Sequence, residues 1–119
     1  VLATGGSDKF VKTWNVERQN NLFGQYGHAD SITALAFRPD GRVLASGSGG
    51  LDTTVRLWKW DNQTSERYLD VLQGQRIPVS ALAFSPDGTR LAVLLAGIPF
   101  ETNVRQAELW LWDVSSIGF

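Results

Sequence analysis

One histidine and two aspartates in equivalent turns are the first candidates for acid–base chemistry in this chain. His28 is the only histidine, and no serine or cysteine nucleophile motif accompanies it. A catalytic triad is recognised by several groups placed together, so a lone histidine indicates a structural role more than a catalytic one. Asp40 and Asp87 lie in Pro-Asp-Gly turns of separate repeats, where aspartate bonds the local backbone. We therefore predict no catalytic residue and no enzyme activity.

Ligand-binding motifs are equally sparse in the sequence. The glycine-rich stretches at 5–6 and 47–50 lack the Gly-Lys-Ser/Thr ending of a phosphate-binding loop, and a strand pattern follows each instead of a helix. The chain has no cysteine, which excludes disulfides and thiolate metal sites. Histidine and acidic residues do not cluster at metal-ligand spacing. We therefore expect no metal and no cofactor.

Composition indicates a globular protein with no charged binding surface. The 119 residues are 43% hydrophobic, and 11 basic residues nearly balance 12 acidic ones. This balance favours neither nucleic acid nor a membrane surface as a partner. The longest apolar run, 91–96, has the length of a buried strand and not of a membrane span. We expect a cytoplasmic piece of a longer polypeptide, because the chain opens inside a strand pattern and lacks methionine.

These residues lie beside short strands, which are clearest between residues 27 and 61. Apolar residues alternate over 32–37, 42–48 and 54–60, with Pro-Asp-Gly and Gly-Ser-Gly-Gly turns between these segments. Period-two alternation interrupted by such turns predicts antiparallel strands in tight hairpins.

The same pattern recurs along the chain. Residues 1–16 match the second half of the central unit, and a third copy begins at Gly74. The period is about 45 residues, which is typical of a propeller blade of four strands. A blade cannot bury both of its faces alone, so adjacent repeats must cover each other.

The anchors of these repeats resemble those of the WD-repeat family. That family opens each unit with a Gly-His pair and closes it with a Trp-Asp pair. Here the central unit opens with Gly27-His28 and closes with Val55-Arg56-Leu57-Trp58, with Asp61 nearby, and the third unit ends in Trp112-Asp113. The resemblance implies an all-β fold, a partial β-propeller of four-stranded antiparallel blades with about two and a half repeats.

The repeats divide the chain into three parts of one incomplete propeller domain. Residues 1–26 correspond to the second to fourth strands of a blade, and 27–73 form a complete blade. Residues 74–119 form a blade with an enlarged hairpin at 96–106 and without its last strand. The remaining blades of the same propeller are therefore expected partners of this chain.

In WD repeats, a hydrogen-bonded tetrad of His, Ser or Thr, Asp and Trp holds each blade together. By resemblance, the central blade supplies His28, Ser46, Asp52 and Trp58. The first blade retains Thr4, Asp8 and Trp14.

The third blade departs from the tetrad pattern. It keeps only Trp110, with Gln75 at the histidine position and Val93 at the serine position. We expect this blade to depend on apolar packing through Leu91, Val93, Leu94 and Leu95.

The resemblance also implies a function. Propellers of this family mostly act as rigid platforms that bind other proteins or peptides, so we predict a non-catalytic interaction scaffold. Partners commonly dock on a rim built by the loop before the first strand and by the hairpin between the second and third strands. The matching positions are Ser7, Asp30, Ser31, Thr33, Leu51, Pro78, Ser80 and Phe100.

Two alternatives remain open from the sequence. The chain could be a sensor propeller attached to a bacterial signalling protein that carries a kinase or nucleotide-binding switch domain. It could also be the gating propeller of a hydrolase or peptidase, in which motifs like 84–92 also recur. The Gly-His and Trp-Asp pairs argue against the peptidase.

Overall fold

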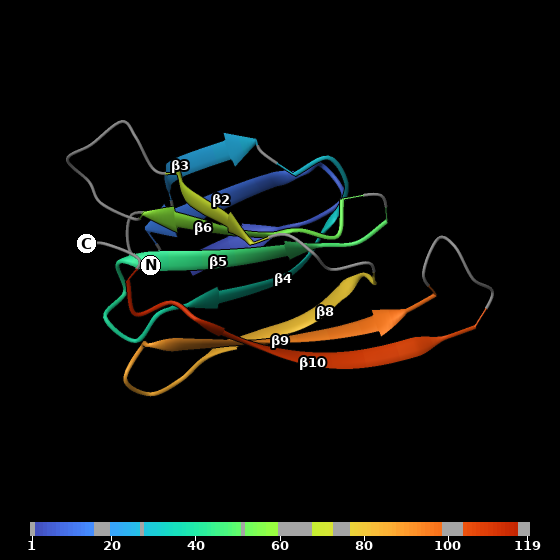
Figure 1. Cartoon of the computed structure of the whole chain (residues 1–119). Coiled ribbons are helices and arrows are strands. Elements are labelled where there is room, and N and C mark those ends of the chain that lie inside the picture. Colours follow the sequence, from blue (N-terminus) through green and yellow to red (C-terminus); the bar gives the residue numbers. More distant parts are fainter. Residues whose placement is uncertain are drawn as a thin grey trace.

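Ten antiparallel β-strands arranged in three sheets make up the part of the chain that the structure describes. The structure is a computed structural model, and it describes residues 2–15, 20–26, 28–50, 52–59, 68–72, 77–98 and 104–116. The sheets lie side by side, and the second lies between the other two (Figure 1).

The first sheet has the strand order β1-β2-β3. Its strands are β1 (Leu2–Gly5), β2 (Phe10–Asn15) and β3 (Asn20–Tyr26). The register shifts between Thr13 and Trp14, because β3 has one extra residue between Asn21 and Phe23.

The second sheet has four strands in the order β4-β5-β6-β7. They are β4 (Ile32–Phe37), β5 (Val43–Ser48), β6 (Val55–Lys59) and β7 (Tyr68–Leu72). Gly41 closes the turn between β4 and β5 with a φ of 73°, a conformation that glycine adopts at little cost. The segments predicted from the sequence, 32–37, 42–48 and 54–60, agree with β4, β5 and β6 to within one residue at each end.

The third sheet has the order β10-β9-β8. Its strands are β8 (Val79–Phe84), β9 (Arg90–Gly97) and β10 (Gln106–Asp113). In this sheet β9 and β10 pair over eight residues, from Arg90 opposite Asp113 to Gly97 opposite Gln106.

Two apolar layers hold the sheets together. A small layer between the first and second sheets contains Val11, Ile32, Leu44 and Trp58. A larger layer between the second and third sheets contains Val43, Ala45, Val55, Leu57, Leu72, Ile77, Val79, Leu91, Val93, Leu95 and Val114. Neighbouring sheets thus bury each other's faces, as the repeat pattern predicted.

The expected role of Leu94 in this core is wrong. Leu91, Val93 and Leu95 are fully buried, but Leu94 is 41% exposed. Successive side chains of a strand point to opposite faces, so Leu94 turns away from the second sheet. It shares the outer side of the third sheet with Leu109 and Leu111, which are also exposed.

Glycine allows the sheets to approach closely at equivalent points of two repeats. A Cβ atom added at Gly47 would lie 2.3 Å from Cγ1 of Val79, the first residue of β8. A Cβ atom added at Gly5 would lie 2.6 Å from Cγ2 of Ile32, the first residue of β4. A side chain at either glycine would therefore push the next sheet away.

Candidate functional site

Four polar side chains of the second sheet form a continuous hydrogen-bonded chain. His28 Nδ1 lies 3.1 Å from Asp52 Oδ2, and His28 Nε2 lies 2.7 Å from Ser46 Oγ. The indole Nε1 of Trp58 donates to Ser46 Oγ over 2.7 Å. The structure thus brings together the four residues that the family resemblance named for the central blade.

The groups at the two ends of this hydrogen-bonded network, the Trp58 indole and the Asp52 carboxylate, determine where its protons lie. Indole N–H can only donate and an ionised carboxylate can only accept. His28 Nδ1–H therefore donates to Asp52, and the Ser46 hydroxyl accepts from Trp58 while donating to His28 Nε2. Burial lowers the pKa of His28 below its usual value and outweighs the opposing attraction of Asp52. His28 is thus neutral at pH 7, which matches this assignment.

Thr54 joins the network, although the sequence reasoning did not name it. Its Oγ1 donates to Asp52 Oδ1, and its backbone N–H donates to the same oxygen over 3.0 Å. The backbone N–H of Ala29 donates to Asp52 Oδ2. Burial disfavours the Asp52 carboxylate, but these bonds outweigh it and hold its pKa below the usual value. A Thr two residues after an Asp is the local signal that could have identified Thr54.

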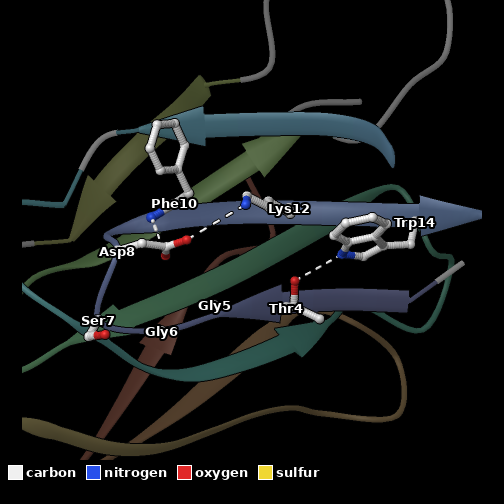
Figure 2. A pocket seen from close by; sticks show the side chains of 8 residues that line it. All are labelled: Thr4, Gly5, Gly6, Ser7, Asp8, Phe10, Lys12 and Trp14. Carbon is white, nitrogen blue, oxygen red and sulfur yellow. Dashed lines mark hydrogen bonds and ion pairs between the residues drawn. The ribbon is translucent and has the colours of Figure 1, made fainter. Parts of the chain in front are cut away.

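The first sheet contains an open version of the same arrangement (Figure 2). Trp14 Nε1 donates to Thr4 Oγ1 over 2.9 Å, as Trp58 does to Ser46. Asp8 accepts from the backbone N–H of Phe10 over 3.2 Å and lies 3.6 Å from Lys12 Nζ. The structure therefore joins Thr4 to Trp14, whereas Asp8 bonds elsewhere.

The third sheet has replaced the polar chain with apolar packing, and Trp112 rather than Trp110 lies opposite Leu91, as Trp58 lies opposite Leu44. Val93 is fully buried at the position that Ser46 holds in the second sheet. Trp110 Nε1 donates to Glu108 Oε2 over 2.8 Å, a contact near the surface that the sequence reasoning missed. Gln75 lies outside the described residues. The Trp110 ring also stacks on Trp112, with centroids 5.8 Å apart.

Comparison with known proteins agrees with this geometry. The family model "WD domain, G-beta repeat" matches residues 20–59 and 66–96. The chain belongs to the WD-repeat family. This membership confirms the resemblance that the anchors indicated and the propeller fold class that it implied.

Matches to two curated relatives cover nearly the whole chain. Mitochondrial division protein 1 of Schizosaccharomyces pombe is 34% identical, and the match covers 96% of this chain and 18% of that protein. WD repeat and SOCS box-containing protein 1 of Xenopus tropicalis is 32% identical, with 96% of this chain and 24% of that protein covered. The WD-repeat chain thus spans about a fifth of the length of these relatives.

A solved structure shows the same similarity in three dimensions. One chain in the crystal structure of the mitotic checkpoint complex aligns with a TM-score of 0.75 and 25% sequence identity. The alignment covers 96% of this chain and 32% of that chain.

Several residues predicted for the rim lie around the glycine-rich hairpin after β5. The Ser31 carbonyl accepts from Ser48 Oγ over 2.7 Å, and the Ser31 N–H donates to Asp30 Oδ1 over 2.7 Å. The Thr33 hydroxyl is held between the Gly47 and Val79 carbonyls and so links the second sheet to the third.

The other rim positions lie around this hairpin or outside the described residues. Pro78 approaches Gly49 from the third sheet, and its carbonyl accepts from Ala96 N–H over 3.0 Å. Ser80 is exposed on β8, and Ser7 is exposed beside Gly6 in the first sheet. Leu51 and Phe100 lie outside the described residues, so their part in the rim stays a prediction.

The two turn aspartates lie closer together than their separate repeats suggested. Asp40 and Asp87 line one cavity of about 220 Å³ between the second and third sheets, together with Arg38, Pro39, Gly88, Thr89 and Ser115. Asp87 accepts from Ser85 Oγ and from Thr89, and these bonds lower its pKa to about 2.

Asp40 is also acidified. Desolvation opposes its ionisation, but the Arg42 backbone N–H and the Arg38 guanidinium outweigh it and lower its pKa. A general acid needs a raised pKa, so neither carboxyl has the property of one.

The described ranges contain neither a metal-ligand cluster nor a helix of membrane-spanning length. No group of three or more His, Cys, Asp or Glu side chains in those ranges could hold a metal ion. The same part of the chain contains no helix that is long and apolar enough to cross a membrane.

Proposed function

We propose that this chain is a segment of a non-catalytic propeller that binds other proteins through its rim. The observation that carries the proposal is the gathering of Asp30, Ser31, Thr33 and Pro78 around the hairpin at 47–50. Residues from two sheets form one surface there, and both sheets belong to a WD-repeat fold. Propellers of this family generally serve as interaction scaffolds.

Rigidity of the rim backbone supports this proposal. Gly49 N–H donates to the Ser31 carbonyl over 3.3 Å, and Asp52 N–H donates to the Gly49 carbonyl over 3.2 Å. A surface that is already ordered loses little conformational entropy when a partner binds. The relatives described above lend no support to the peptidase and signalling-protein alternatives.

Affinity capture with matched variants tests the rim. Asp30→Lys and Ser80→Lys each place a cation on the rim, and we expect them to release the captured partner proteins. The control is Arg42→Glu, which reverses an exposed charge in the turn at the other end of β4 and β5. Circular dichroism and thermal melting should be unchanged in all three variants.

Two outcomes would count against rim binding. If the rim variants keep the same captured proteins as the unaltered chain, the rim is not the docking surface. If Arg42→Glu releases the same proteins, the loss is not specific to the rim.

A further inference from the structure

The cavity of about 220 Å³ between the second and third sheets lies at the opposite end of the strands from the rim. One wall is the turn between β4 and β5, and the other is the equivalent turn between β8 and β9. The two turns are in contact, because a Cβ atom added at Gly88 would lie 3.0 Å from Cγ of Arg38. Ser115, which follows β10, also lines the cavity. The cavity therefore exists because two neighbouring repeats pack together, and its walls belong to the described residues.

The charges of the cavity lining do not balance. Arg38 is 3% exposed, and its guanidinium is held by Asp40, with Nε donating to Oδ1 over 3.0 Å and Nη2 lying 2.7 Å from Oδ2. Asp87, on the facing turn, forms no ion pair with any described residue. The nearby Arg42 and Arg90 do not line the cavity. The buried ion pair thus leaves the Asp87 carboxylate as the uncompensated charge of the lining.

The hydroxyl groups of the lining have already used their donor hydrogens. Thr89 Oγ1 donates to Asp87 Oδ1 over 2.8 Å, and Ser115 Oγ donates to Asp113 Oδ1 over 2.6 Å. A hydroxyl has a single hydrogen, so both oxygens offer only lone pairs to a ligand. The bonds that Asp87 accepts from Ser85 and Thr89 all end at Oδ1, which leaves Oδ2 as an acceptor. The lining therefore offers acceptors and a negative charge.

We propose that this cavity binds an arginine side chain of a partner protein. A guanidinium group is cationic, carries N–H donors on several sides and has no acceptor, so it matches this lining. The Asp40 side chain is 41% exposed and Asp87 is exposed, so a partner can reach both carboxylates. Pockets for drug-sized molecules measure about 300–1,000 Å³, and this smaller cavity suits one side chain.

The site is separate from the rim, and the proposal does not rest on rim binding. A lysine side chain places all its donors on one strongly hydrated nitrogen atom, whereas the planar guanidinium can bond groups on both turns. Arginine should therefore be preferred over lysine.

Short peptides with one variable central residue are the probes. The peptide acetyl-Gly-Gly-Arg-Gly-Gly-amide is compared with the same peptide carrying lysine or citrulline, the neutral isostere of arginine. Each is titrated into the isotope-labelled whole chain at pH 7, and the amide signals of Thr89 and Ser115 are followed by NMR. We expect shifts that saturate with the arginine peptide. The citrulline peptide should bind at least about tenfold more weakly, because its bonds to the carboxylates lose their charge.

Variants of the chain locate the binding site. Asp87→Asn keeps the Oδ1 acceptor of the turn but removes the charge and the second acceptor. It should weaken the arginine peptide about tenfold and have little effect on the citrulline peptide. Asp8→Asn is the matched control, since Asp8 is an exposed aspartate of the first sheet that does not line the cavity. Because the citrulline substitution leaves the chain unaltered, it tests the proposal even if a chain variant fails to fold.

Four results would overturn the proposal. Equal affinity of the arginine and citrulline peptides would exclude recognition of the guanidinium charge, and equal affinity of the lysine peptide would exclude selection of arginine. Equal effects of Asp87→Asn and Asp8→Asn would place the peptide elsewhere. Loss of arginine-peptide binding in Asp30→Lys would place the peptide on the rim. We expect Asp30→Lys to leave this titration unchanged, so a failure of the rim proposal and a failure of this one are distinguishable.

Discussion

Removal of the His28 imidazole should destabilise the fold without changing any surface. In His28→Ala, the bond to the Asp52 carboxylate and the bond to the Ser46 hydroxyl are both lost. A bond to a charged group contributes about 1.5–3 kcal/mol and a neutral one about 0.5–1.5 kcal/mol. Asp52 keeps its bonds from Ala29 and Thr54, which limits the penalty. We therefore expect a loss of about 2–4 kcal/mol in the free energy of unfolding.

The network also predicts how His28→Ala combines with Ser46→Ala. Ser46→Ala alone should cost about 1–3 kcal/mol, because it leaves buried nitrogen atoms of His28 and Trp58 without this partner. In the double variant the bond between His28 and Ser46 is already absent, so the two costs should not add. The double variant should be about 1 kcal/mol more stable than the sum predicts.

Urea denaturation followed by tryptophan fluorescence measures these free energies, at pH 7.5 where His28 is neutral. Ser80→Ala is the matched control, because Ser80 is an exposed serine on β8 and its loss should change stability by less than about 0.5 kcal/mol. Additivity of the two substitutions to within about 0.5 kcal/mol would refute the coupled network. Unchanged stability of His28→Ala with loss of a binding or catalytic activity would show that the role of His28 is not structural.

Three further predictions concern pH and packing. Burial lowers the pKa of His28 in the folded chain, so the unfolded chain takes up this proton at a higher pH. The free energy of unfolding should therefore be at its full value above about pH 6.5 and should fall as the pH drops toward the folded pKa. Urea titrations of His28→Ala should lack this part of the pH dependence. Trp58→Phe should cost at least about 1 kcal/mol because it removes a buried donor, whereas Trp110→Phe, whose donor bonds near the surface, should cost less than about 0.5 kcal/mol; equal shifts in thermal melting would contradict this ranking. Gly47→Ala should cost about 1–3 kcal/mol through the clash with the next sheet, and Gly6→Ala, which meets no atom within 4 Å, is the control in the same unfolding assay.

Sequence pattern predicted the strands because they depend on local rules. Alternation of apolar residues over 32–37 fixes which side chains share a face, and Pro-Asp-Gly fixes where the strand reverses. The family resemblance identified His28, Ser46, Asp52 and Trp58. These residues are far apart in the sequence and come into contact only when the chain folds.

Thr54 and Glu108 were missed for a physical reason. Each lies two residues from its partner, Asp52 or Trp110, but hydroxyl and carboxylate groups are common on protein surfaces and do not by themselves indicate a bond. Leu94 was misplaced because the run 91–95 is apolar throughout, so it carries no alternation from which a face could be assigned.

The sequence by itself therefore determined the repeat and the strand pattern, which neighbouring positions encode, and the family resemblance named the residues of the polar chain. Tertiary structure alone decided how the repeats meet. Asp40 and Asp87 line one cavity because the sheets pack side by side, and Gly47 lies against Val79 because β8 approaches the end of β5.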